Sequence, residues 1–468
     1  MTRRLVVVSN RLPVVLTRDG GEWRTRPASG GLVSALAPIL GAESGLWIGW
    51  PGTSEAPAVV EQLRSASERS GYGLEPVFLT AEERSQFYLG FSNEIIWPLF
   101  HDLQSRCNFD PAYWGSYVAV NRKFSHAMAQ LARPETLFWV HDYHLMETAR
   151  FLREMGAQAR VAFFLHIPFP PPDIFEKLPW CESILRSLLE FDLVGFQTRR
   201  DLRNFVQCLN ALVKGASLHR DSGFLQARLG ERKVRLGHFP ISIDFRAFAE
   251  QASRPEVADR AARIRVEQKD CQLVLGVDRL DYTKGIPERL KAFRNLLARF
   301  PDLRRKIVLV QVAVPSRADI PRYRELKTEI ERLVSEVNGE YTQSGWVPVH
   351  YLYRNLNRNE LLAYYRAASV ALVTPLKDGM NLVAKEYCAA QVDNDGTLIL
   401  SEFAGAAAEL KRGALLVNPY DSEGVAAAIH QAFHMDPAER HERMRRMRQI
   451  IRQADIFRWA ASFLKAAP

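Results

Sequence analysis

Short runs of apolar residues alternate along almost the whole chain with longer stretches in which apolar residues recur every three or four positions. The short runs are continuous and rich in β-branched residues, which is typical of strands buried on both faces of a parallel sheet. The longer stretches predict amphipathic helices that cover such a sheet. In the first half, strands are predicted at Leu5–Ser9, Leu46–Trp50, Leu137–His141, Val161–His166 and Leu193–Phe196, with helices such as Tyr117–Ala132 and Leu202–Val213 between them.

The same alternation starts again in the second half of the chain. Two successive series of strands and helices predict an α/β fold with two Rossmann-like domains, each a doubly wound parallel sheet, facing a central cleft. The first domain is expected over residues 1–240 and the second over 241–454, with the boundary near His238–Phe248. The second series has predicted strands at Leu273–Val277, Ile307–Val312, Val370–Thr374, Thr397–Leu400 and Leu415–Val417, and helices at Ile286–Phe300, Arg322–Val337, Glu360–Ala368 and Gly424–Phe433.

Residues at strand ends are the first candidates for chemistry, because ligands of doubly wound folds bind at the carboxyl ends of the strands. The first strand ends in Ser9-Asn10-Arg11, and Gly30-Gly31 precedes the next helix. A glycine pair lets backbone N–H groups approach a phosphate, although an ordinary loop can carry the same pair. The fingerprint G-x-G-x-x-G is missing, which disfavours a nicotinamide or flavin enzyme.

Two neighbouring strands are followed by titratable residues. His141, Asp142 and His144 come after one strand, and His166 comes after the next. A metal site, helix caps with satisfied histidines, and polar contacts to a hydroxyl-rich ligand are all compatible with this pattern. The absence of H-E-x-x-H disfavours the metal site.

In the second half, the loop Val277–Gly285 carries Arg279 and Lys284 between a strand and a helix. A fork-shaped guanidinium and a mobile ammonium at this place suit a pyrophosphate. The alternative is an exposed loop whose acidic and basic groups pair with one another.

A second loop of this kind lies within Thr374–Tyr387. Backbone N–H groups of residues Asn381 to Ala384 would point at a phosphate there. Glu386, one turn further along, could accept hydrogen bonds from two ribose hydroxyls, or it could be a solvated residue paired with Lys385 or another neighbour.

Composition narrows the class of protein. Of the 468 residues, 47% are hydrophobic and 25% charged, which excludes a disordered or fibrous chain. The net charge of +9 is compatible with nucleic acid, a membrane surface or small phosphorylated substrates. Six arginines lie between Arg440 and Arg452, but their helical spacing predicts a solvated basic face, and no nucleic-acid-binding signature accompanies them. No nucleic-acid partner is therefore expected.

The five cysteines are odd in number and never spaced as C-x-x-C, which favours a reducing compartment. The apolar run after Met1 stops at Ser9, short of the roughly 7–15 residues of a signal peptide core. No stretch approaches the ~20 apolar residues that span a bilayer. A cytoplasmic protein without a membrane partner is expected.

Taken together, these segments resemble the trehalose-6-phosphate synthase family, retaining glycosyltransferases of the GT-B class. The resemblance covers residues 6 to 421, and RLDYTKG and DGMNLVAKEY are its most specific parts. The matching segments, in order, are VVVSNR, SGGL, LWIGW, FSNEIIWPLFH, FWVHDYHL, FFLHIPFP, LVGFQT, RLDYTKGIPERL, TPLKDGMNLVAKEY, LSEFAGAAAEL and LLVNPYD.

The resemblance implies transfer of glucose from UDP-glucose to glucose-6-phosphate with retention, giving α,α-trehalose 6-phosphate and UDP, in trehalose biosynthesis and osmoprotection. It implies a catalytic set of Asp142, His166, Arg279, Lys284 and Asp378. The acceptor would be bound by Arg11, Tyr88, Trp97, Asp142 and Arg317. The donor would be bound by Gly30, Gly31, His166, Arg279, Lys284, Leu356, Asp378, Gly379, Met380, Asn381, Leu382, Val383, Ala384, Lys385 and Glu386.

The resemblance further implies no cofactor and no metal, because two fixed cations already neutralise the diphosphate. It also implies a homo-oligomer, a separate trehalose-phosphate phosphatase, and a C-terminal helix (455–468) that crosses back onto the first domain. Two departures, the long first loop Leu16–Arg26 and Pro171-Pro172-Asp173, concern the acceptor side. The alternatives are a glucosylglycerol-phosphate synthase or related retaining transferase with another acceptor, and a non-enzymatic regulatory relative.

Overall fold

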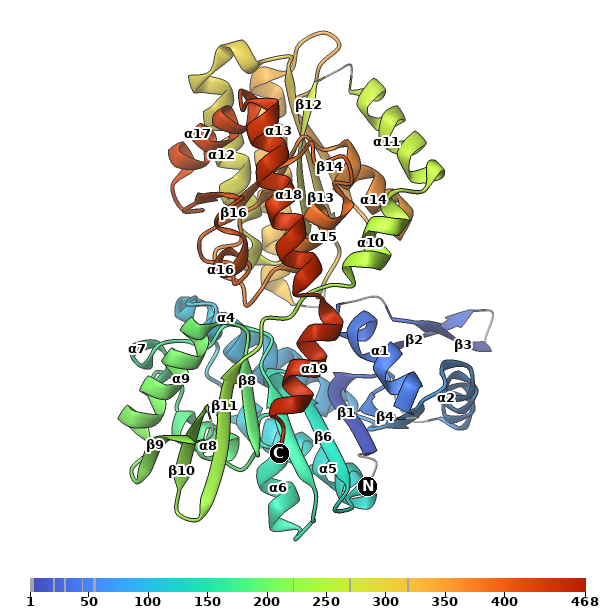
Figure 1. Ribbon diagram of the computed structural model, residues 1–468, viewed down its shortest axis with the longest axis vertical. Helices are drawn as coiled ribbons and strands as arrows, with labels where there is room; N and C mark the ends of the chain where they lie inside the picture. The colour runs from blue at the N-terminus through green and yellow to red at the C-terminus, as the bar shows by residue number, and fades with distance from the viewer. Residues whose placement is uncertain are drawn as a thin grey trace. The chain divides into compact units, whose positions relative to one another are not determined.

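The computed structural model describes residues 4–19, 22–28, 31–43, 45–53, 56–221, 223–268, 271–317 and 320–468. The chain divides into two compact units (Figure 1). Unit 1 consists of Met1–Ile241 together with Phe457–Pro468, and unit 2 consists of Ser242–Ile456. No described helix combines the length and the apolar character needed to cross a membrane.

Unit 1 is built on one large sheet with the strand order β5-β4-β1-β6-β7-β8-β11-β10-β9. The strands from β5 to β11 pair in parallel, whereas β9 and β10 add an antiparallel edge. The strands are β1 (Arg4–Arg11), β4 (Leu46–Trp50), β5 (Gly73–Pro76), β6 (Thr136–His141), β7 (Arg160–Phe164), β8 (Leu193–Phe196), β9 (Ala216–Asp221), β10 (Phe224–Leu229) and β11 (Arg232–His238).

The central strands of the unit 1 sheet are buried along nearly their whole length because helices cover the sheet. Every residue of β6 is buried, as are the six inner residues of β1. The helices are α1 (Gly31–Glu43), α2 (Pro57–Ser70), α3 (Ala81–Glu83), α4 (Trp97–Phe100), α5 (Pro111–Leu131), α6 (Thr148–Glu154), α7 (Pro172–Phe175), α8 (Cys181–Leu188) and α9 (Arg199–Leu212), with the π-helix η1 (Arg84–Ile96) and the 3₁₀ turns η2 (Gln104–Arg106) and η3 (Tyr143–Leu145).

Unit 2 is an all-parallel sheet in the order β14-β13-β12-β15-β16-β17. Its strands are β12 (Gln272–Arg279), β13 (Ile307–Val314), β14 (Val349–Tyr353), β15 (Val370–Val373), β16 (Thr397–Ser401) and β17 (Leu415–Val417). Its helices are α10 (Phe245–Ala252), α11 (Pro255–Glu267), α12 (Ile286–Arg299), α13 (Pro321–Tyr341), α14 (Arg358–Ala367), α15 (Leu382–Ala390), α16 (Ala407–Leu410), α17 (Ser422–Phe433) and α18 (Pro437–Gln453), with the 3₁₀ turns η4 (Tyr282–Lys284) and η5 (Pro301–Leu303).

Both sheets share one topological feature that decides where a ligand can bind. In each, the first strand of the series lies in the middle, and the chain moves to one side before it returns to the other. The strand order therefore reverses between β1 and β6 in unit 1, and between β12 and β15 in unit 2. In doubly wound folds the binding crevice opens at the carboxyl ends of the strands at this switch point.

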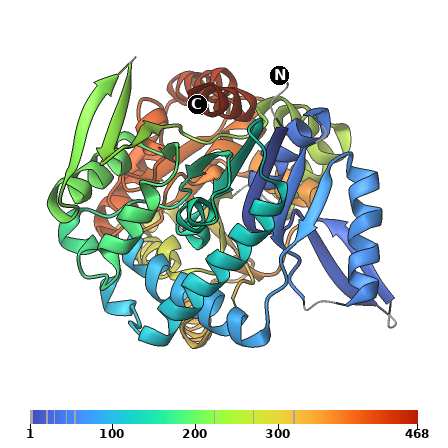
Figure 2. The ribbon, with the colours of Figure 1, turned by 90° about the horizontal axis from the view of Figure 1, so that it is seen from below.

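The predicted loop Leu16–Arg26 is wrong, because much of this segment forms an antiparallel hairpin of β2 (Val14–Asp19) and β3 (Glu22–Pro27). The many polar residues of this hairpin make its strands difficult to predict, because β2 and β3 form a separate sheet outside the buried one. Figure 2 shows the hairpin beside α2, where Arg69 donates a hydrogen bond of 2.9 Å to the Thr25 hydroxyl.

The last helix, α19 (Ile456–Ala466), packs against the sheet of unit 1. Phe463 stacks on Trp139 of β6 at 4.5 Å between ring centroids, and Trp459 lies 5.1 Å from the same ring. The Trp459 indole donates to the carbonyl of Phe239 at 3.1 Å, so the apolar face of α19 is also anchored by a polar contact.

Candidate active site

Arg11 is the last residue of β1, at the switch point of the unit 1 sheet. Its guanidinium lies over the ring of Trp50, the last residue of β4, at 4.7 Å from the centroid. Gly52 adopts a φ of 92°, and a Cβ atom there would overlap the guanidinium. The glycine thus leaves the space in which an exposed cation rests on an aromatic face.

Tyr88 and Trp97 come from η1 and the start of α4, so a π-helix sets their spacing. Tyr88 lies 6.1 Å from the Trp50 ring and stacks on His144 at 5.9 Å. Trp97 is buried and lies 5.8 Å from the ring of Tyr143. These rings form a continuous, largely buried aromatic cluster near the carboxyl ends of β4 and β6.

Asp142 directly follows β6, on the other side of the switch point from Arg11. Its backbone has a φ of 74°, a conformation that costs a non-glycine residue roughly 1–3 kcal/mol and is concentrated at functional sites. The Asp142 N–H donates to the carbonyl of Phe164 at 2.8 Å, and its carboxylate accepts from the His166 N–H at 3.2 Å. Asp142 and His166 are therefore held together by backbone contacts.

His166 is half-buried, and its Nε2 lies 3.1 Å from Nδ1 of the fully buried His141. Burial lowers the pKa of His166 to about 3. Burial, with a further contribution from His166, also lowers the pKa of His141 well below its usual range. Both imidazoles are neutral at physiological pH, so His166 can exchange hydrogen bonds with hydroxyl groups but cannot supply a positive charge.

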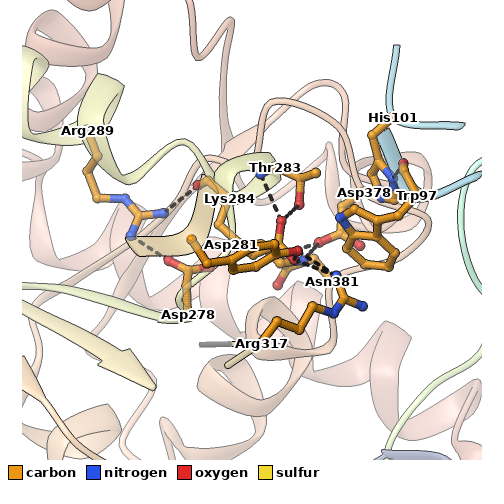
Figure 3. A network of polar contacts seen from close by, with 11 residues as sticks. Trp97, His101, Asp278, Asp281, Thr283, Lys284, Arg289, Arg317, Asp378 and Asn381 are labelled. Atoms are coloured by element: carbon orange, nitrogen blue, oxygen red, sulfur yellow. Dashed lines mark hydrogen bonds and ion pairs between the residues drawn. The ribbon is translucent and has the colours of Figure 1, made fainter. Parts of the chain in front are cut away.

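In unit 2, the loop after β12 is organised around the buried carboxylate of Asp281 (Figure 3). Its Oδ1 accepts from the backbone and hydroxyl of Thr283 at 3.0 and 2.9 Å. Its Oδ2 accepts from Arg317 at 3.3 Å and from the Tyr323 hydroxyl at 3.2 Å. Burial opposes ionisation, but the neighbouring cations, led by Arg317, outweigh it and lower the pKa of Asp281.

Arg317 also donates to the Tyr323 hydroxyl at 2.6 Å, and its backbone has a φ of 47°. Asp281 and Tyr323 thus hold the Arg317 side chain, while its backbone keeps a strained conformation. Neither Asp281 nor Tyr323 was among the sequence-predicted site residues, because contacts between residues 36 and 42 positions apart leave no local pattern.

Lys284 and Asp378 form an ion pair of 2.6 Å between the loops that follow β12 and β15 (Figure 3). The Asp378 carboxylate also accepts from the Asn381 amide at 3.2 Å. Asn381 has a φ of 71°, which makes it a third strained residue at the predicted site. Arg279, the exposed last residue of β12, lies at the same switch point.

The segment Asp378–Asn381 is locked against the loop after β16. Gly405 donates to the carbonyl of Asp378 at 3.1 Å, and Ala406 donates to the carbonyl of Met380 at 2.8 Å. A Cβ atom at Gly405 would collide with the Gly379 carbonyl. Among the described residues, no side chain caps the N-terminus of α15, which leaves the N–H groups of Leu382 onward available to an anion.

The other predicted donor residues are placed as follows. Glu386 is half-buried on α15 and accepts from the Tyr365 hydroxyl at 3.0 Å; burial raises its pKa. Lys385 points elsewhere: its ammonium is buried in an ion pair of 2.7 Å with Glu409, so only its backbone is available to a donor. Leu356 is half-buried between β14 and α14. Gly31 begins α1, whereas Gly30 lies outside the described residues.

Beneath the Lys284 loop lies a buried arginine that sequence reasoning did not single out. Arg289 pairs with Asp278 at 2.6 Å and donates to the side chains of Gln311 at 2.9 Å and Thr374 at 3.2 Å. Its Nη2 also faces the carbonyl of Lys284 at 3.4 Å. The guanidinium therefore connects β12 and β13 to both donor-side loops.

Comparison with known proteins decides the family. The model of glycosyltransferase family 20 matches residues 3–468. The chain belongs to this family. A trehalose-6-phosphate synthase of Mycolicibacterium paratuberculosis is 46% identical to it over 98% of this chain and 94% of that protein.

Two solved structures of related proteins carry ligands. One, from E. coli, is bound with UDP-2-fluoro glucose; it is 37% identical and covers 99% of this chain and 98% of its own, with a TM-score of 0.88. The other, an α,α-trehalose-phosphate synthase (UDP-forming) from Burkholderia xenovorans in complex with glucose-6-phosphate, is 35% identical with a TM-score of 0.88, covering 99% of this chain and 100% of its own. The predicted family, enzyme class and GT-B type of α/β fold are thereby confirmed for this family 20 member.

Proposed function

We propose that this family 20 enzyme transfers glucose from UDP-glucose to glucose-6-phosphate with retention, giving α,α-trehalose 6-phosphate and UDP. The observation that carries the proposal is the position of Arg279 and Lys284 at the switch point of the unit 2 sheet. Lys284, through its contact with Asp378, lies near an α15 N-terminus that, in the described part of the chain, no side chain caps. Two cations and a row of N–H groups match a diphosphate leaving group.

On the donor side, Lys284 would exchange Asp378 for the diphosphate. Asp378 and Asn381 would then be free to bind hydroxyls of the transferred glucose, a role that family resemblance also assigns to His166. Glu386, fixed by Tyr365 in its half-buried position, would accept the ribose hydroxyls. Gly30, Gly31 and Leu356 are assigned to the donor by family resemblance.

On the acceptor side, Arg11, Tyr88 and Trp97 would surround the phosphate of glucose-6-phosphate, and Asp142 would accept its hydroxyls. Family resemblance assigns Arg317 to the acceptor phosphate as well. Its guanidinium is already oriented by Asp281 and Tyr323, so little side-chain entropy remains to be lost on binding.

The reaction forms one bond and breaks one. The bond between C1 of glucose and the β-phosphate oxygen breaks, and C1 bonds to the anomeric oxygen of the acceptor on the same face. The acceptor's proton passes to the departing phosphate oxygen. Arg279 and Lys284 stabilise the negative charge that develops on UDP, as preorganised donors do in an oxyanion hole. His166 remains neutral and acts by hydrogen bonding.

We further propose that this chemistry needs no metal, since two side-chain cations serve the diphosphate. Turnover that persists in excess EDTA is the expected result, and turnover restored only by added Mg²⁺ would contradict it. The product still carries a phosphomonoester, so a separate phosphatase would be required to release the free sugar. The five free thiols suit a reducing cytoplasm, and a homo-oligomer is predicted.

The decisive experiment is a donor and acceptor panel with the purified chain. UDP-, ADP- and GDP-glucose are each combined with glucose-6-phosphate or glycerol-3-phosphate, and products are identified by NMR. The expected product has two α-configured anomeric protons and forms with UDP-glucose and glucose-6-phosphate. Activity confined to glycerol-3-phosphate would establish the glucosylglycerol-phosphate alternative instead.

A further inference from the structure

We propose a structural site for a divalent transition metal of the zinc type in unit 2, formed by His430, His434 and Asp302. In the described part of the chain, these three side chains form the one group whose possible ligand atoms all lie within 4.8 Å of one another. They belong to α17 and the turn η5, and none of them belongs to the proposed active site.

The two histidines are arranged for chelation by the helix itself. His434 follows the last residue of α17 and donates its N–H to the carbonyl of His430 at 3.2 Å, so this last turn places the two imidazoles side by side. The ring centroids lie 4.6 Å apart. Paired imidazoles at i and i+4 on one helix are a recurrent ligand arrangement for zinc.

His430 is the preorganised member of the set. It is half-buried and stacks on Phe300 at 4.0 Å between centroids with an interplanar angle of 23°. Asp302, two residues beyond Phe300 in η5, supplies the carboxylate. His434 and Asp302 are exposed, so small side-chain rotations can bring the three ligand atoms to the spacing of about 3.4 Å that zinc bonds of 2.0–2.1 Å require.

The surroundings favour a cation. The site lies at the C-terminal end of α17, a helix of 12 residues, where the aligned peptide dipoles give a partial negative charge. The nearby Arg299 is already paired with Glu423 of α17 at 3.0 Å. Two imidazoles with one carboxylate select zinc, nickel or copper over magnesium or calcium, which prefer oxygen ligands.

A metal held here would cross-link η5 and α17, which lie far apart in the sequence and otherwise contact each other only by non-covalent packing. Asp302 follows the C-terminal end of α12, whereas Lys284 precedes its N-terminus, so roughly 20 Å of helix separates the metal from the donor loop. We therefore expect the ion to stabilise unit 2 without taking part in glucosyl transfer.

The test measures Zn²⁺ binding to the full chain by competition with a chromophoric chelator, together with thermal unfolding. We expect one high-affinity zinc per chain, and a rise in apparent Tm of about 5 °C or more at a hundredfold excess over Kd, with no such rise for Mg²⁺. The variants His434→Gln and Asp302→Asn should each raise Kd at least about tenfold. His126→Gln, which removes an exposed histidine on α5, is the matched control and should bind as the parent does.

Cobalt substitution separates this site from adventitious binding by the free cysteines. The expected Co²⁺ complex has visible d–d bands without thiolate charge-transfer absorption. Thiolate absorption, or zinc affinity unchanged in both His434→Gln and Asp302→Asn, would overturn the proposal. Turnover of His434→Gln in the absence of added metal should equal that of the parent, which keeps this result independent of the proposed enzymatic activity.

Discussion

The guanidinium of Arg289 and the carboxylate of Asp278 form an ion pair of 2.6 Å that is almost completely inaccessible to water. Burial raises the pKa of Asp278 despite this partner, which shows how strongly the surroundings disfavour an isolated charge. Because the same guanidinium also contacts the Lys284 carbonyl, the ion pair supports the conformation of the loop that carries Lys284.

Replacing Arg289 by Met should therefore destabilise the enzyme by about 3–5 kcal/mol, since Asp278 is left buried without a counter-charge. Urea unfolding measures this loss. The double variant Arg289→Met with Asp278→Asn should recover part of the stability but not the kcat, because the loop remains unsupported. A double variant with full activity would show that the pair has no positioning role.

Lys284→Ala should lower kcat by about 10²–10³ while the fold stays intact, because the variant lacks one of two cations that stabilise the departing UDP. Steady-state kinetics with UDP-glucose and a thermal unfolding curve give both readouts. Lys411→Ala, at an exposed position near α16, is the charge-matched control and should behave like the parent. Unchanged turnover in Lys284→Ala would refute the assigned role.

Gly405→Ala should reduce kcat/KM for UDP-glucose by about a hundredfold, because the new methyl group pushes Gly379 and the segment Asp378–Asn381 out of position. Gly115→Ala is the control: Gly115 is exposed within α5, and a Cβ atom there meets nothing within 4 Å. That variant should gain up to about 1 kcal/mol of stability and keep its activity. If both variants were fully active, the close packing at Gly405 would be irrelevant to the donor site.

The low pKa of His166 predicts a specific loss of stability in acid. In the unfolded chain an imidazole takes up a proton near pH 6.5, but in the fold His166 does so only near pH 3. The unfolded state binds more protons between these values, so the free energy of unfolding contributed by His166 is complete above pH 6.5 and falls as the pH drops toward 3.

Urea unfolding at about pH 7 and about pH 4.5 tests this relation. The stability lost between the two conditions should be smaller in His166→Gln than in the parent, whereas His126→Gln should lose as much as the parent. An equal loss in all three proteins would mean that His166 is readily protonated in the fold.

The sequence predicts the central strands of both sheets, because continuous apolar runs such as residues 137–141 and 307–312 have few other uses in a globular protein. The strands toward the sheet edges, β5, β9, β10 and β14, together with β11, are not predicted. The hairpin of β2 and β3 escapes notice because its one apolar run, Val14–Leu16, is short and the remaining residues of both strands are mostly polar. The π-helix η1 is not predicted either. Its segment is recognised by its similarity to the family motif FSNEIIWPLFH and not by a helical spacing of apolar residues.

The candidate site is predictable in part because strand ends at a switch point are recognisable from the order of strands and helices. Arg11, Asp142 and Arg279 could be singled out in this way. Partners distant in sequence could not: the contacts of Arg317 with Tyr323 and Asp281, and of Lys385 with Glu409, arise only when separate loops are brought together. The sequence alone left open whether Glu386 pairs with Lys385, but in the structure it accepts from Tyr365.

The packing of α19 has a consequence for how the protein is made. Trp139 lies in the middle of the unit 1 sheet, yet its ring is covered by Trp459 and Phe463, which a ribosome reaches only after all of unit 2. At 5–20 residues per second, residues 242–466 take roughly 10 to 45 s to synthesise. During that interval the nascent first unit exposes an aromatic surface, which makes it a substrate for chaperones until its last helix arrives.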